Sequence, residues 1–295
     1  MLNIQLEQVL PSEIERRSFE LIDQELKSMG IRLKPEQEPV IKRAIHTTAD
    51  FEYAGNLVFS EHAVQKGIDA LKQGAVIVTD TNMGWSGVNK RKLSALGGEA
   101  LCFMADKDVA EEAAEKGTTR AVASMEKAAR LFGRSRPCIF AIGNAPTALI
   151  RLYELVKEGS ISPSLVIGAP VGFVNVVQSK ELILTLEDTP YIVAKGRKGG
   201  SNVAAAICNA LLYQSPLGQQ TQPEHPALDI HIVERSGWQR AKKLMLLQNI
   251  DLTIAAGEMV LILGGSGAGK TTFMNAVMGY EKAEGRILHG EIGRA

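Results

Sequence analysis

The sequence has 295 residues, 45% hydrophobic and 22% charged, which is typical of a globular protein with a sizeable buried core. Lys and Arg (33) balance Asp and Glu (33), so net charge predicts no nucleic-acid partner and no anionic membrane surface. The three cysteines (Cys102, Cys138 and Cys208) are scattered, and neither a signal-peptide pattern nor an apolar run of about 20 residues is found. We therefore expect a cytoplasmic protein with free thiols and no direct membrane insertion.

Short apolar runs alternate with amphipathic segments over residues 1–213, which we interpret as one domain. In chain order, the expected helices are Pro11–Met29, Pro35–Thr48, Glu61–Lys72, Thr118–Phe132, Pro146–Lys157 and Ser201–Leu212. The expected strands are Ala75–Thr79, Ala100–Met104, Cys138–Ile142, Leu165–Gly168 and Tyr191–Ala194. Strands separated by helices of this length predict an α/β fold with a parallel or mostly parallel sheet and helices on both faces.

Four loops after these strands are rich in Gly, Asn and Pro: residues 79–90, 143–147, 168–175 and 195–202. In an open parallel sheet such loops gather at the carboxyl ends of the strands, where ligands bind. Glycine permits close backbone approach, and helix N-termini offer free N–H groups to anions. Each loop alone is also an ordinary turn sequence. Four together predict a ligand site at this edge of the sheet.

One histidine stands out among five. His46 lies near the end of the helix expected over 35–48, with Asp50 one turn on, and both features favour a protonated imidazole that can act as an acid. A solvated helix-end histidine without chemistry is the alternative. The cysteines lack metal-site spacing, and GxSxG and GxGxxG motifs are missing where nucleophilic or dinucleotide chemistry would need them. The residues thus predict an acid and no cofactor or metal.

At this point the sequence resembles a known family, the precorrin-8X methylmutases, over about residues 12–212. The resemblance rests on separated blocks in one order: IERRSFELI (14–22), IHTTADFEYAGNLVFS (45–60), TDTNMGWSGVNK (79–90), GTTRAVASM (117–125), AIGNAPTAL (141–149), GAPVGFVNVVQSK (168–180) and KGRKGGSNVAAA (195–206).

The resemblance implies a cofactor-free isomerase and homodimer that moves a methyl group from C11 to C12 of a corrin precursor, with His46 as general acid. Two segments, TTADFEY (47–53) and DTNM (80–83), look more like the enzymes of the cobalt (anaerobic) branch than those of the metal-free branch. The product is cobyrinate in the cobalt branch and hydrogenobyrinate in the metal-free branch. Met83, Trp85 and Phe173 are candidate apolar walls, or core residues, and Lys198 is a further candidate cation. The residues expected to bind the carboxylate-rich substrate are Arg17, Ser18, Asp80, Thr81, Met83, Lys90, Arg120, Asn144, Thr147, Gly172, Arg197, Gly200 and Ser201.

A second pattern follows a Pro- and Gln-rich linker expected over 214–228. Residues 229–295 contain a Walker A motif after an apolar strand expected at Met259–Leu263, and resemble the opening of an ABC-transporter ATPase. Its expected nucleotide-binding residues are Gly264, Gly267, Gly269, Lys270, Thr271 and Thr272. No Walker B or LSGGQ stretch follows, so we expect a truncated P-loop NTPase-like fragment with weak or no ATP/Mg²⁺ binding and no hydrolysis. A corrinoid-binding protein coupled to ATP-dependent transport or regulation is the alternative function.

Overall fold

The computed structural model describes residues 9–10, 13–133, 135–215, 228–239, 242–254, 269–278 and 284–289. The chain divides into two compact units, residues 1–218 and 219–295, and each is described by itself. No helix in the described ranges is long and apolar enough to span a bilayer.

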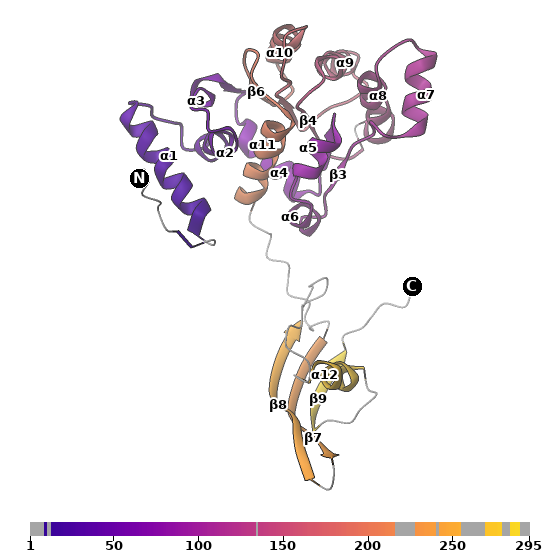
Figure 1. Ribbon diagram of the computed structural model, residues 1–295. Coiled ribbons are helices and arrows are strands. Elements are labelled where there is room, and N and C mark those ends of the chain that lie inside the picture. The colour runs from indigo at the N-terminus through magenta and orange to yellow at the C-terminus, as the bar shows by residue number, and fades with distance from the viewer. Residues whose placement is uncertain are drawn as a thin grey trace, which may run out of the picture. The chain divides into compact units, whose positions relative to one another are not determined.

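A six-stranded sheet forms the centre of the first unit (Figure 1). Its strands are β1 (Leu57–Phe59), β2 (Val76–Thr79), β3 (Glu99–Leu101), β4 (Cys138–Ile142), β5 (Leu165–Gly168) and β6 (Tyr191–Ala194), in the spatial order β1-β6-β5-β4-β2-β3. β2 to β6 run parallel, and β1 pairs antiparallel with β6 at the edge. The expected α/β architecture is confirmed, with a mixed sheet.

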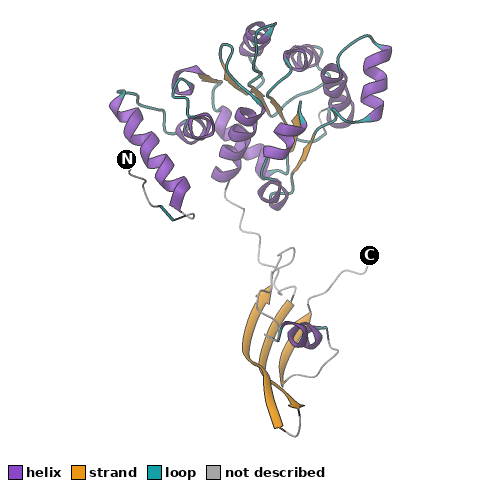
Figure 2. Ribbon diagram, viewed as in Figure 1, coloured by secondary structure: helices purple, strands orange, loops and turns teal. Residues whose placement is uncertain are grey.

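Helices cover both faces of this sheet (Figures 1 and 2). On one face, α4 (Ala63–Lys72) and α11 (Ser201–Gln214) pack on the strands. Helix α2 (Glu38–Thr48) packs on α11 and α1 (Ile14–Ser28) on α2, and all four share one core. The other face packs against α7 (Lys107–Glu115), α8 (Arg120–Phe132), α9 (Pro146–Lys157) and α10 (Val176–Leu184). Alternate residues of each strand enter the two cores: Ile139 and Ala141 face the first, Phe140 and Ile142 the second. This burial on both faces explains why the strands appear in the sequence as continuous apolar runs.

Several elements differ from those expected. β4, β5, β6 and α9 have the predicted bounds, whereas α2 begins at Glu38 and not at Pro35. The short elements α3 (Tyr53–Asn56), α5 (Asn82–Gly87), α6 (Lys90–Ala95) and the edge strand β1 carry too few residues to show a periodicity, and α7 and α10 were also missed. Local capping explains α5, because the Thr81 hydroxyl accepts a hydrogen bond from the Gly84 N–H at 3.0 Å.

The order of the strands fixes where a site can form. The chain passes from β2 to β3 on one side and then crosses to β4 on the other side of β2. The connection after β2 therefore runs to one side of the sheet and the connection after β4, to β5, runs to the other. This makes the carboxyl ends of β2 and β4 a topological switch point, the place where ligands bind in open α/β sheets.

The second unit has an antiparallel sheet, β7 (Leu228–Gln239), β8 (Lys242–Ile254) and β9 (Glu284–His289), in the order β8-β7-β9. Helix α12 (Lys270–Val277) packs Phe273, Ala276 and Val277 against Ile230 and Ile232. Gly269 to Thr272 lie at the start of α12, while Gly264, Gly267 and the strand expected at Met259–Leu263 lie outside the described residues. The expected P-loop fragment is therefore not established as a fold.

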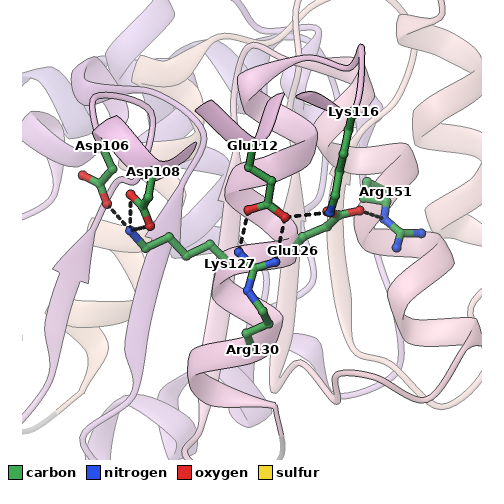
Figure 3. A network of polar contacts seen from close by, with 8 residues as sticks. All are labelled: Asp106, Asp108, Glu112, Lys116, Glu126, Lys127, Arg130 and Arg151. Atoms are coloured by element: carbon green, nitrogen blue, oxygen red, sulfur yellow. Dashed lines mark hydrogen bonds and ion pairs between the residues drawn. The ribbon is translucent and has the colours of Figure 1, made fainter. Parts of the chain in front are cut away.

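A network of ion pairs ties α7, α8 and α9 together on the outer face of the first unit (Figure 3). Glu112 of α7 accepts two hydrogen bonds from Arg130 of α8, at 3.0 and 2.7 Å, and a third from Lys116 at 2.6 Å. Lys116 also contacts Glu126, which in turn accepts from Arg151 of α9 at 2.9 Å. Hydrogen bonds from Arg130 and Lys116 lower the pKa of Glu112 from 4.5 to about 2.

We predict that Glu112→Gln lowers the free energy of unfolding at pH 7 by about 1 kcal/mol, because the pairs are partly solvated. Since the pKa of Glu112 is lowered by folding, its contribution is present above pH 4.5 and is lost as the pH falls toward about 2. Urea titrations of both proteins at pH 7 and pH 2.5 measure this difference. Glu111→Gln, at an exposed residue 3.6 Å from Lys107, is the matched control and should change little. An equal loss at both pH values would contradict the prediction.

Candidate active site

A buried carboxylate bridges the ends of β2 and β4. Asp80 follows β2, is 1% exposed, and accepts hydrogen bonds from the backbone N–H groups of Gly143, Asn144 and Ala145 at 2.8, 2.8 and 2.6 Å. Burial raises the pKa of the Asp80 carboxyl, and the three N–H donors offset part of that rise. Asp80 thus holds the β4–α9 loop, a different role from the direct substrate contact expected from the sequence.

The same loop packs against the start of α11. The hydroxyls of Thr81 and Ser201 lie 2.7 Å apart, and a Cβ atom on Gly143 would lie 2.5 Å from the Cα of Ser201. Any larger residue at position 143 would therefore push the two loops apart. Ser201 is 8% exposed, so its hydroxyl is used in joining the loops.

The loop between β6 and α11 is fixed by a buried cation that we did not predict. Lys180 of α10 is fully buried, and its Nζ donates to the carbonyls of Gly196 at 2.8 Å and Lys198 at 2.7 Å. Burial lowers the pKa of Lys180 to about 8. A Cβ on Gly199 would lie 2.2 Å from the carbonyl oxygen of Ala169, so this loop also rests closely on the one after β5. All four glycine-rich loops thus meet at one edge of the sheet.

Exposed apolar side chains stand on these loops. Met83 is 71% exposed and Phe173 80% exposed, so the interpretation of them as core residues is wrong. The Arg197 guanidinium lies 5.5 Å from the centroid of the Phe173 ring. An apolar surface with a cation beside it suits a flat ligand that carries carboxylates.

Trp85 and Lys90 make local contacts at the same edge. The indole N–H of Trp85 donates to the Ala100 carbonyl at 2.9 Å, and Lys90 Nζ donates to the Trp85 carbonyl at 2.7 Å while lying 4.0 Å from the indole centroid. Lys90 is thus engaged in fixing α5 and α6 in this structure.

His46 lies at the edge of a separate hollow of about 290 Å³ between α2 and α11. It is exposed in the last turn of α2, and its ring stacks on that of Phe19 with centroids 5.2 Å apart. Asp50, expected to assist it, instead pairs with Lys198 at 2.7 Å, which lowers the pKa of Asp50. The lining residues are Arg43, His46, Thr47, Gly87, Asn202, Ala205, Ala206, Asn209 and Tyr213.

Helix α11 lines the hollow beside His46 and begins at the glycine-rich loops, so this helix links the two. Asn202, which lines it, directly follows Ser201, whose hydroxyl meets Thr81. Asn209 of α11 donates to the Gly87 carbonyl at 2.9 Å and accepts from the Asn89 N–H at 2.8 Å, which fastens α5 and α6 to α11. Asn202 lies in the predicted loop 195–202 but was not singled out, and Asn209 was not predicted, because the rest of α11 shows only an apolar pattern in the sequence.

The remaining predicted residues are spread more widely. Arg17 and Ser18 lie on α1; Arg17 pairs with Glu20 at 3.5 Å, and the Ser18 hydroxyl donates to the Ile14 carbonyl. Arg120 is exposed at the start of α8, and Thr147 at the start of α9 lies 3.2 Å from Thr119. These four residues thus lie on three different helices, α1, α8 and α9. Asn144 and Gly172 lie on the loops after β4 and β5, and the Gly172 N–H donates to the Arg197 carbonyl at 3.3 Å.

Within the described ranges, no group of three or more His, Cys, Asp or Glu residues is arranged to hold a metal.

The comparisons with known proteins agree with this architecture. The family described as precorrin-8X methylmutase matches residues 13–214. The cobalt-precorrin-8 methylmutase of Priestia megaterium is 45% identical over 203 residues, covering 69% of this chain and 88% of the relative. The precorrin-8X methylmutase of Pseudomonas aeruginosa is 37% identical, covering 67% and 93%. A crystal structure of the precorrin-8X methylmutase from Thermus thermophilus superimposes with a TM-score of 0.62 at 37% identity, covering 69% of this chain and 97% of that one.

The chain therefore belongs to the precorrin-8X methylmutase family. A separate match, to the ABC transporter family, covers residues 247–293 and lies outside the part shared with the methylmutases.

We predict that Asp80→Asn destabilises the first unit by about 2–3 kcal/mol, because an amide cannot accept from all three N–H groups and its own NH₂ would face donors. Urea unfolding followed by circular dichroism measures the loss. Asp69→Asn, on the exposed face of α4, is the matched control and should stay within about 0.5 kcal/mol of the parent. Equal stability of the two variants would show that the Asp80 contacts do not hold the loops.

Proposed function

We propose that this chain is an isomerase of cobalamin biosynthesis that moves a methyl group from C11 to C12 of precorrin-8X or cobalt-precorrin-8. The observation that carries the proposal is the match to curated methylmutases across nearly their whole length, 88–95% of the first three relatives. The loops at the switch point and the accessible His46 supply the chemistry such a reaction needs.

The reaction is internal to the substrate. His46 donates a proton to the ring system, the C11–methyl bond breaks as the C12–methyl bond forms, and the proton is given back, so that the formula does not change. The protein then needs only to place the acid, hold one tautomer and exclude water, and the step uses no cofactor or metal held by the protein.

The loop surface provides the binding interactions. Exposed Arg197 and Arg120 are charge-assisted donors for the substrate carboxylates, and Phe173 and Met83 pack on the apolar ring. Backbone N–H groups at the start of α11 add neutral donors. Arg17 is a further donor if the substrate extends to α1.

We favour the cobalt-containing substrate. The first five relatives carry the name cobalt-precorrin-8 methylmutase at 38–45% identity, and the precorrin-8X methylmutases of Pseudomonas aeruginosa and Sinorhizobium follow at 37% and 36%. Turnover of the two substrates in parallel assays, followed by absorbance, decides between the branches. We also propose a cytoplasmic protein without a nucleic-acid partner. It forms a homodimer, whose molar mass light scattering of the purified chain measures.

We predict that His46→Asn lowers kcat by about 10²–10⁴, the range for loss of a general acid, with a much smaller effect on KM. The change is followed as the absorbance shift on conversion of cobalt-precorrin-8. His62→Asn is the matched control, because His62 is exposed and has φ 57°, a conformation that asparagine tolerates. Wild-type turnover by His46→Asn would remove this residue from the chemistry.

The second unit is proposed to bind MgATP weakly and not to hydrolyse it. Lys270 and Thr271 at the start of α12, with Thr272 beside them, are the residues for the β- and γ-phosphates and Mg²⁺, and the ABC transporter match supports this assignment.

We predict millimolar affinity for a fluorescent ATP analogue, reduced further in Lys270→Ala, and no phosphate release. Thr253→Ala on β8 is a control within the same unit. Micromolar affinity, steady hydrolysis, or a change in corrin binding on adding ATP would contradict the prediction. The last result would favour the alternative of an ATP-coupled corrinoid-binding protein.

A further inference from the structure

The imidazole of His46 is held in place by a ring from another helix. Phe19 projects from α1, and its ring stacks on His46 with an angle of 11° between the planes and 5.2 Å between the centroids. In the described part of the chain, His46 makes no hydrogen bond or ion pair with another side chain. The ring nitrogens thus have no such partner there, and the imidazole makes a flat contact with the Phe19 ring.

Phe19 is itself part of a longer stack. The Cζ atom of Arg43, one turn before His46 on α2, lies 4.8 Å from the Phe19 centroid and 4.9 Å from the Tyr213 centroid. Arg43 also pairs with Glu15 of α1. The stack thus connects α1, α2 and the last turn of α11 through rings and one cation.

The stack borders the hollow beside His46. Arg43, His46 and Tyr213 all line it, together with Asn202 and Asn209. Tyr213 is fixed in turn, since Asn89 Nδ2 donates to its hydroxyl at 3.4 Å and Lys92 lies 5.1 Å from its ring. A surface histidine normally samples several staggered rotamers. A ring on one side and a fixed wall on the other restrict His46 to few of them.

We propose that Phe19 is the positioning residue for His46, whose imidazole it presents to the substrate through the stack shared with Arg43 and Tyr213. This inference rests on the proposed function, in which His46 is the acid. Holding a proton donor in its productive orientation lowers the barrier of the chemical step without adding a contact to the substrate. Loss of the stack is thus expected to act on kcat and not on KM.

The experiment removes the ring while keeping an apolar side chain of intermediate size. Phe19→Leu is expected to lower kcat about ten- to a hundredfold with KM unchanged, whereas Phe19→Tyr, which keeps the ring, is expected to retain kcat within about twofold. Ile22→Ala is the matched control, because Ile22 lies one turn on in the same helix and is buried in the core. It loosens the packing of α1 without touching the stack. Phe19→Met serves as a second ring-free variant should Phe19→Leu not fold.

A spectroscopic readout separates positioning from stability. Stacking on Phe19 places the His46 ring protons in the aromatic ring current, so that they resonate upfield in the parent protein and in Phe19→Tyr. In Phe19→Leu they move downfield, while in Ile22→Ala they keep their shift and kcat changes less than in Phe19→Leu.

The outcomes distinguish this inference from the proposed function. If Phe19→Leu loses the upfield shift but keeps wild-type kcat, while His46→Asn is inactive, the positioning role is wrong and the function stands. If His46→Asn is fully active, the assignment of the acid fails first, and the positioning role fails with it. A fall in kcat in Ile22→Ala equal to that in Phe19→Leu would also overturn the inference, since it would show a general effect of α1 packing.

Discussion

One buried carboxylate determines the shape of the proposed active site. Asp80 lies where the chain reverses its direction across the sheet, and it gathers three backbone N–H groups of the β4–α9 loop. A helix N-terminus attracts negative charge, and here the charge comes from the neighbouring strand end and not from a ligand. The cost of burying the carboxylate is offset by donors that would otherwise lack partners, and the two strand ends become one rigid surface.

The other loops are assembled on this surface by similar means. A buried cation, Lys180, holds the loop before α11 through two carbonyls, and glycines at 143 and 199 allow backbones to approach to a distance that no side chain would permit. Charges and glycines are therefore used for positioning, while the side chains that stand outward, Phe173 and Arg197 among them, remain accessible. This division between buried polar groups that position and exposed groups that bind suits a reaction with little covalent chemistry.

The two units are different in kind. The first has two hydrophobic cores, one on each face of its sheet, and matches methylmutases over nearly their full length. The second has a small core of its own and matches the ABC transporter family over residues 247–293. The match to the methylmutase family lies within the first unit.

The sequence by itself determined the strands β4, β5 and β6, the helix α9, the family, and the four loops that meet at the site, because buried strands and turn residues leave local patterns. It also singled out His46, but not its neighbours. The antiparallel edge strand, the role of Asp80 in holding a loop, and the stack of Phe19 on His46 were decided by tertiary structure alone. These features join residues far apart in the chain, and their distances depend on how helices pack on the sheet, which no local pattern of residues specifies.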